Sequence, residues 1–164
     1  MSPFRAMYKP YFNAPRIGPH PAVDFAGAMG DPVLAADDGV VYAVSGAENH
    51  LCGNGVWLYH GRWRLYTQYC QLQEARVTPG TAVKRGDVIG LLGDSGEPQA
   101  CRRVSGAPCP MLHFGVYDRF RRYADGDSLE GAHDPMALIV GCFDPAKTYA
   151  ADRPALTYPL RCRR

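Results

Sequence analysis

Histidines at particular spacings are the clearest candidates for chemistry in this sequence of 164 residues, which contains five of them. His20 and Asp24 stand four residues apart in the string His-Pro-Ala-Val-Asp. An imidazole nitrogen and a carboxylate oxygen both bind Zn²⁺, so this pair could face one metal ion. The spacing alone is a weak signal, because 16 acidic residues bring such pairs together by chance. A hydrogen-bonded surface histidine is the alternative.

His113 is the second candidate, in the string Met-Leu-His-Phe that begins at Met111. The string is predicted to be a strand, in which successive side chains point to opposite faces. Leu112 and Phe114 would then face the core, and Met111 would share the other face with His113. On its own, this pattern also fits a histidine on the surface of a sheet.

Short strands must position these residues, because the sequence has 18 Gly and 14 Pro and no sustained helical period. Turn dipeptides such as Asp38-Gly39 and Pro79-Gly80 separate the β-prone runs. These runs occupy residues 33–35, 40–44, 56–60, 64–70, 77–83, 88–92 and 111–117. We therefore predict a mostly β fold, with a twisted antiparallel sheet that is barrel-like. Residues 134–140 could form a short helix or an extended segment.

The composition excludes several classes of protein. The formal net charge is +2, too balanced for a nucleic-acid binder, and 46% hydrophobic residues argue against disorder. No apolar run approaches the length of a membrane span, so we expect none. We divide the chain into an N-terminal arm (1–17), one domain (18–140) and a C-terminal tail packed on the domain (141–164), both arms being extended.

Six cysteines without a CxxC spacing indicate disulfides and an oxidising compartment. We expect a secreted or periplasmic protein whose signal segment has been removed; a cytosolic protein with free thiols is the alternative. A hairpin turn near Arg62 or Trp63 would place two cysteines nearly opposite each other on the two strands. The expected pairs are Cys52–Cys70, Cys101–Cys109 and Cys142–Cys162, although six cysteines also allow other connectivities.

The order of several short motifs resembles the lysostaphin/LytM-type zinc metallopeptidases. The motifs are His20-x-x-x-Asp24-Phe25, Gly30-x-Pro32-Val33-x-Ala35, Asp38-Gly39-Val40-Val41, Gly55-Val56-x-Leu58-x-His60-Gly61, Tyr69-x-Gln71-Leu72, the glycine-punctuated stretch 77–96, Leu112-His113-Phe114 and Asp134-Pro135. They cover residues 18–140 in one order. No single motif is decisive, but the ordered set is specific.

The resemblance implies a groove across the sheet that holds zinc and binds the stem peptides or cross-bridges of peptidoglycan. The ligands carried over are His20, Asp24 and His113, all present in this sequence. Three protein ligands leave a fourth position for water, which is the pattern of a catalytic zinc site.

Two further histidines of that family, which assist catalysis without binding the metal, are replaced here. Gln71 stands in the Tyr-x-His-Leu motif, and Met111 stands at the first position of the His-x-His motif. Glutamine cannot shuttle a proton near neutral pH, and methionine can neither shuttle one nor donate a hydrogen bond. Possible substitutes are His50, in the loop 45–55, and Tyr69, which we expect on the same strand face as Gln71.

Three hypotheses follow from these residues. The first is a zinc-binding, catalytically degenerate domain that binds a peptidoglycan peptide or a cell-wall protein, with a regulatory role and as a monomer. The second is an active zinc endopeptidase that cleaves peptidoglycan cross-links with unconventional catalytic residues. The third is a disulfide-stapled structural module whose ligand triad is a relic.

Overall fold

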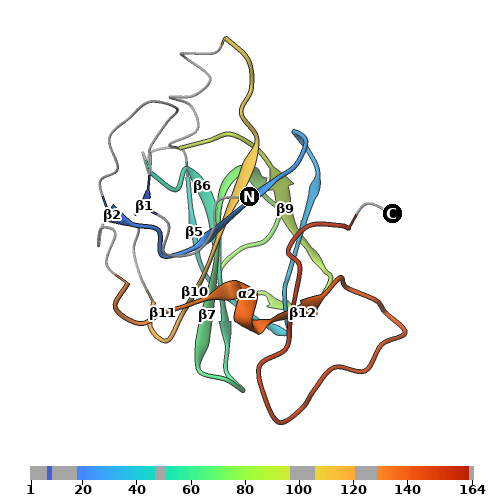
Figure 1. Ribbon diagram of the computed structural model, residues 1–164. Coiled ribbons are helices and arrows are strands. Elements are labelled where there is room, and N and C mark those ends of the chain that lie inside the picture. Colours follow the sequence, from blue (N-terminus) through green and yellow to red (C-terminus); the bar gives the residue numbers. More distant parts are fainter. Residues whose placement is uncertain (1–6, 9–17, 47–50, 97–105, 121–128, 163–164) are drawn as a thin grey trace.

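The computed structural model describes residues 7–8, 18–46, 51–96, 106–120 and 129–162 (Figure 1). Within these ranges the protein is mostly β. The strands are β1 (Met7–Tyr8), β2 (Gly18–Pro19), β3 (Val23–Ala26), β4 (Pro32–Leu34), β5 (Gly39–Ser45), β6 (Asn54–His60), β7 (Leu65–Ala75), β8 (Ala82–Val83), β9 (Val88–Leu92), β10 (Met111–Tyr117), β11 (Ala132–His133), β12 (Ile139–Gly141) and β13 (Leu156–Thr157). The helix α2 (Pro135–Leu138) is a single turn capped by Asp134.

The main sheet runs in the order β11-β10-β7-β6-β5-β8, with β3 paired to β10 and β9 paired to β7 and β4. Its pairings are antiparallel, as the turn spacing predicts. The sheet is open and does not close into a barrel. No helix in the described part of the chain is long and apolar enough to cross a membrane.

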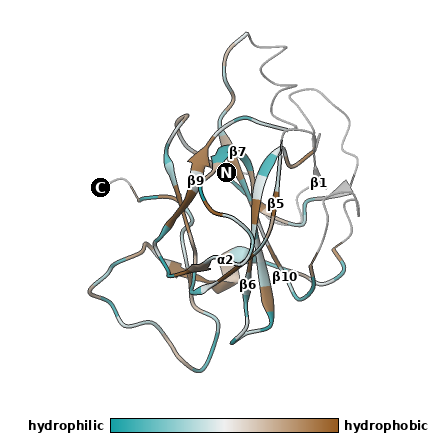
Figure 2. Ribbon diagram, turned by 180° about the vertical axis from the view of Figure 1, so that it is seen from behind, coloured by the Kyte–Doolittle hydropathy of each residue, from teal (hydrophilic) through white to brown (hydrophobic). Residues whose placement is uncertain are grey.

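One face of the sheet forms the hydrophobic core. Leu58 of β6, Tyr69 of β7 and Phe114 of β10 are fully buried there. Figure 2 shows hydrophobic residues gathered in the strands, with β9 among the most hydrophobic. Burying a side chain of this size stabilises the fold by about 1.5–3 kcal/mol. Leu112 is also in the core, so β10 alternates as its sequence predicts.

A buried chain of hydrogen bonds crosses the core beside His60. Nδ1 of His60 lies 2.8 Å from the carbonyl oxygen of Asp38, which can only accept, so Nδ1 carries the proton. Nε2 of His60 therefore accepts, and its neighbour at 2.7 Å is the hydroxyl of Thr67. The Tyr69 hydroxyl lies 3.1 Å further along, from Oγ1 of Thr67. Burial lowers the pKa of His60, and His60 is a structural residue that stays neutral.

The C-terminal strap, residues 142–162, is fastened to this core and closed by the Cys142–Cys162 disulfide (Figure 1). Its strand β13 pairs in parallel with β12. The amide of Thr157 donates to the carbonyl of Ala36 at 2.9 Å. The guanidinium of Arg62 donates to the carbonyl of Ala151 at 2.6 Å. Strap and sheet are therefore packed as one unit.

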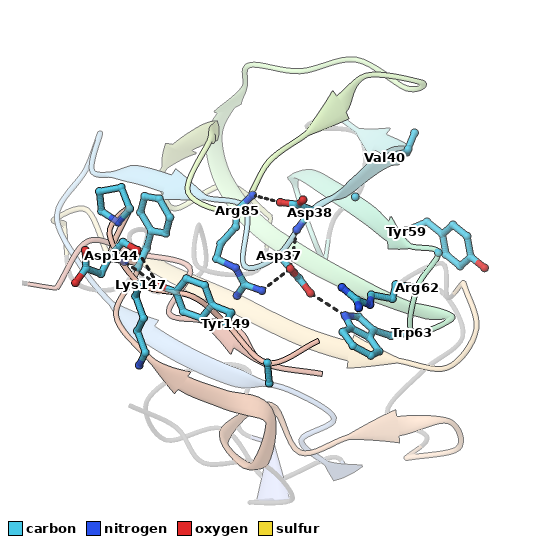
Figure 3. Close-up of a pocket in the computed structure, with 15 residues that line it drawn as sticks. Asp37, Asp38, Val40, Tyr59, Arg62, Trp63, Arg85, Asp144, Lys147 and Tyr149 are labelled. Atoms are coloured by element: carbon cyan, nitrogen blue, oxygen red, sulfur yellow. Dashed lines mark hydrogen bonds and ion pairs between the residues drawn. The ribbon is translucent and has the colours of Figure 1, made fainter. Parts of the chain in front are cut away.

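A pocket of about 860 Å³ lies between the strap and the turn that joins β6 to β7 (Figure 3). At its base, the carboxylate of Asp37 pairs with Arg85 and accepts a hydrogen bond from the indole of Trp63 at 2.8 Å. Arg85 also stacks on the ring of Tyr149, 4.1 Å from its centroid. These polar groups are used within the protein, so they join the strap to the core.

The Asp37–Arg85 pair gives a first prediction, with a matched control next to it. Both side chains are about nine-tenths buried, so Asp37→Ala leaves the buried guanidinium of Arg85 without its carboxylate partner. This change should lower the free energy of unfolding by about 3–5 kcal/mol. Asp38 pairs with Lys84 at the surface, where its side chain is 58% exposed, so Asp38→Ala should cost less than about 1 kcal/mol. Urea denaturation of both variants measures the difference. Equal losses would show that the buried pair does not fasten the strap.

His60 gives a second prediction, on pH. Its pKa is lowered in the folded protein from the ordinary 6.5, so the unfolded chain binds the proton more readily. Its contribution to stability is therefore complete above the unfolded pKa of about 6.5 and is lost progressively as the pH falls from there through the lower pKa of the folded state. Urea midpoints between about pH 8 and pH 5 should fall more steeply for the wild type than for His60→Gln. Parallel pH profiles would contradict a neutral, buried His60.

Candidate metal centre

Three side chains meet where β3 pairs with β10. The register places His113 directly opposite Asp24, and His20 enters from the segment before β3. Nε2 of His20 lies 3.2 Å from Nδ1 of His113 and 3.3 Å from Oδ1 of Asp24. Nδ1 of His113 lies 3.1 Å from the same carboxylate oxygen. All three residues are buried.

This triangle has the dimensions of a zinc site. Ligands about 2.0–2.1 Å from Zn²⁺ at tetrahedral angles lie about 3.3 Å from one another. The three distances between ligand atoms, 3.1, 3.2 and 3.3 Å, match that edge. Two imidazole nitrogens and a carboxylate oxygen are also a donor set that Zn²⁺ accepts. The side chains of His20, Asp24 and His113 therefore fit the metal.

The carboxylate of Asp24 is held in its ionised form. Burial by itself raises the pKa of this group. The hydrogen bonds from His113 and His20, together with their charge, outweigh burial and lower the pKa well below its ordinary value. Asp24 is thus available as an anionic ligand at neutral pH.

Gln71 occupies an irregular point of β7. Its φ of 71° is in the left-handed region, which residues other than glycine seldom adopt. The backbone N–H of Gln71 donates a hydrogen bond to the backbone carbonyl of Cys52 at 2.7 Å, beside a break in the β6–β7 register. The side chain is buried, and Oε1 has no hydrogen-bond partner among the residues that the structure describes. A strained backbone that holds an unsatisfied polar atom is typical of a functional site.

Backbone hydrogen bonds to Gly93 connect Met111 with Gln71. The amide of Met111 donates to the carbonyl of Gly93 at 3.3 Å, and the amide of Gly93 donates to the carbonyl of Gln71 at 3.1 Å. Met111 is half-buried at the start of β10, two residues before His113. The two replaced positions therefore flank one backbone segment at the same end of the sheet as His113.

The structure places Tyr69 in the hydrophobic core, where it is fully buried, and not on the face of Gln71 as the alternation predicts. It pairs with Phe114 on the core face, with the two rings 5.2 Å apart, whereas His113 pairs with Cys70 on the other face. The left-handed conformation of Gln71 breaks the alternation on which that prediction depended. Burial also raises the pKa of Tyr69, which makes its proton harder to release. The other proposed substitute, His50, lies outside the described residues.

The disulfide Cys52–Cys70 lies on the same sheet face as His113, with a Cα–Cα distance of 4.8 Å. Cys52 precedes β6, so the pair forms at the register break and not between directly opposite strand positions. The second pair present is Cys142–Cys162. The expected Cys101–Cys109 pair involves a residue outside the described ranges.

Sequence reasoning overlooked Tyr117. The residues 113, 115 and 117 share one face of β10, and the middle one is Gly115. A Cβ atom added to Gly115 would lie 2.5 Å from the hydroxyl oxygen of Tyr117, so this buried tyrosine folds back over the glycine toward His113. The alternation His-x-Gly-x-Tyr was the available signal, because a glycine in mid-strand leaves room for a neighbour.

Comparison with known proteins identifies relatives of this chain. Residues 18–126 match the family model of Peptidase family M23. The chain is 38% identical over 107 residues to the peptidoglycan DD-endopeptidase ShyA of Vibrio cholerae, which is 65% of this chain and 22% of ShyA. It is 31% identical over 137 residues to lysostaphin of Staphylococcus simulans, which is 80% of this chain and 24% of lysostaphin. The chain thus spans about a quarter or less of the length of these relatives.

Solved structures show the same fold. The catalytic domain of lysostaphin from Staphylococcus simulans has a TM-score of 0.61 and 29% identity, over 80% of this chain and 87% of that chain. A zinc-containing peptidase from Vibrio cholerae has a TM-score of 0.52 and 30% identity, over 70% of this chain and 33% of that chain. The chain therefore belongs to peptidase family M23, with the fold of the lysostaphin-type domains.

Proposed function

We propose that this domain binds zinc through His20, Asp24 and His113 and uses the site to hold a peptide of peptidoglycan, with little or no hydrolysis. The observation that carries the proposal is a complete ligand triangle beside two positions that cannot transfer a proton. The triangle has edges of 3.1 to 3.3 Å. Gln71 and Met111 occupy the two positions.

The ligand triangle would hold the metal with one coordination position left for the bound peptide. Zinc in this position would supply a positive charge that polarises a peptide carbonyl. Asp24 remains ionised beside it, so the protein would contribute one carboxylate charge and two imidazole nitrogens to the site. Burial of the three side chains keeps the ligands oriented before the peptide arrives.

Gln71 suits binding better than catalysis. Its unpartnered Oε1 can accept a hydrogen bond from a peptide N–H, and its amide nitrogen can donate one to a carbonyl. A carboxamide does not take up a proton near neutral pH, and the thioether of Met111 does not either. Loss of one general acid or base typically slows a reaction by roughly 10²–10⁴-fold. We therefore expect a catalytically degenerate domain.

The location and partners follow from the same chemistry. Disulfides persist in oxidising compartments, and this supports a secreted or periplasmic protein. The names of the relatives, which include peptidoglycan endopeptidases, support a peptidoglycan peptide as ligand. If the bound peptide is instead a segment of a cell-wall protein, the domain would have a regulatory role. We expect a monomer that binds no nucleic acid.

An active zinc endopeptidase is the second candidate. The observation that favours it is that His20, Asp24 and His113 lie buried and close together, and that the carboxylate of Asp24 is ionised. A relic site would be free to lose this arrangement. Activity would then require a proton acceptor other than residues 71 and 111, and His50 is one candidate.

Zinc affinity gives the third prediction. His113→Ala removes one of three ligands and should weaken zinc binding by roughly 100-fold or more, since even an outer-shell change costs 10–100-fold. His133→Ala is the matched control, because His133 is exposed on β11 and outside the triangle. Competition with a fluorescent zinc chelator measures both affinities. Equal affinities in the two variants would remove the metal centre from the proposal.

Hydrolysis gives the fourth prediction. Zinc-loaded wild type should release no new peptide ends from peptidoglycan, as read by mass spectrometry. Gln71→His combined with Met111→His restores two proton-transferring groups and should produce cleavage. Histidine tolerates the left-handed backbone at position 71 better than most residues do. Gln73→His, at an exposed position two residues on, is the control for an added histidine.

Peptide ends released by the wild type would decide for the active endopeptidase, provided that they disappear with His113→Ala and after chelation. If the variant with histidine at positions 71 and 111 binds zinc but releases no peptide ends, the domain lacks more for catalysis than these two side chains.

A further inference from the structure

A row of aromatic side chains lies on the face of the sheet opposite the core. The row, called the aromatic face below, consists of Tyr59, Tyr66, Tyr42, Phe120 and Trp57. Successive ring centroids are 4.8, 5.1, 4.7 and 6.1 Å apart. It draws on three neighbouring strands and on the residue Phe120 that follows β10.

The aromatic face is open to solvent at β5. Tyr42 is 49% exposed, and Val40, which lies on the same strand opposite Tyr59, is 42% exposed. Exposed apolar side chains gathered in one patch mark interaction sites on soluble proteins. Tyr59 and Tyr66, directly opposite each other, are half-buried and extend the patch across β6 and β7.

The stretches of strand that carry the aromatic face have no charged side chains, and Glu74, near the end of β7, lies beyond them. Residues 39–45, 54–60, 65–73 and 111–117 contain no Asp, Glu, Lys or Arg. A protein–protein interface usually has a polar, charged rim around its apolar centre. A ligand that matches these strands is uncharged, with apolar surfaces for the rings and hydroxyl or amide groups for the tyrosine hydroxyls.

An unsatisfied donor points to the same kind of ligand. Nε1 of Trp57 is buried without a hydrogen-bond acceptor among the described residues. Buried indole N–H groups ordinarily have an acceptor. A ligand carbonyl or hydroxyl that reached Trp57 past the adjacent ring of Phe120 would supply the acceptor that the protein lacks.

The aromatic face is continuous with the metal centre. Trp57 packs against the disulfide of Cys52 and Cys70, and Cys70 lies directly opposite His113 on β10. One ligand could therefore extend from the metal centre across the disulfide and over the rings. Peptidoglycan has this form, because its peptides are attached to a largely uncharged amino-sugar chain.

We propose that the aromatic face binds the amino-sugar chain of peptidoglycan while the metal centre holds the attached peptide. The apolar C–H face of a sugar ring packs on an aromatic ring, and its hydroxyl and acetamido groups bond to the tyrosine hydroxyls and to the indole. This inference rests on the proposed function for the peptide, whereas binding of the sugar depends on different side chains. The two are therefore separable by experiment.

The test titrates a peptide-free amino-sugar oligomer, the hexamer of N-acetylglucosamine, into the zinc-loaded protein by calorimetry. Tyr42→Ala removes an exposed ring and should weaken binding roughly twofold to tenfold, which corresponds to about 0.5–1.4 kcal/mol for an aromatic contact. Tyr42→Phe keeps the ring and should retain most of the affinity. Val140→Ala is the matched control: it is 46% exposed on β12, in a separate sheet, and should change nothing.

A second titration with a free stem peptide separates the two proposals. His113→Ala should abolish peptide binding and leave the hexamer affinity unchanged. Peptide binding without any hexamer binding by the wild type would overturn the sugar proposal and leave the proposed function standing. Hexamer binding that depends on Tyr42, without peptide binding, would support the sugar face and contradict the peptide site. Concentration-dependent dimerisation lost in Tyr42→Ala, with no hexamer binding, would make the face an interface between copies and overturn the proposal.

Discussion

The pairing of β10 between β3 and β7 is the constraint on which the rest of the site depends. On one side it brings His113 opposite Asp24, and on the other it brings the same residue opposite Cys70. Three electron-rich atoms then lie within 3.3 Å of one another in the interior, an arrangement that a cation stabilises. A register shift of one residue would turn His113 into the core and Phe114 into the site.

The strap and the core depend on each other through a small number of buried polar contacts. Arg85 reaches the carbonyls of Ala36 and Ala155 and the carboxylate of Asp37, so it joins the sheet to the strap. The backbone of the strap adds a bond from the amide of Leu34 to the carbonyl of Pro159 at 2.8 Å. These contacts lie in the region of β4 and β5, whereas the ligand triangle lies between β3 and β10.

Much of the fold could be predicted from the sequence because it depends on local patterns. The alternation from Met111 to Tyr117 predicted the strand with both ends correct, and the order of motifs singled out the three side chains that meet beside it. The errors arose where the backbone departs from regular geometry. No alternation rule predicts that Gln71 has a φ of 71°, and the wrong prediction that Tyr69 shares a strand face with Gln71 follows from it. The folding back of Tyr117 over Gly115 depends on packing that a sequence pattern does not encode.

The position of the Cys52–Cys70 disulfide has a consequence for how the protein matures. In a newly made, reduced chain, Cys70 would present a sulfur atom opposite His113, on the face where His20, Asp24 and His113 meet. Thiolate is a softer ligand than carboxylate and competes well for zinc, so the metal could be captured in the wrong coordination sphere. Oxidation removes that competitor. If the triangle binds zinc as proposed, the order of events would matter, because closing the bridge before the metal is loaded would remove the competing thiolate.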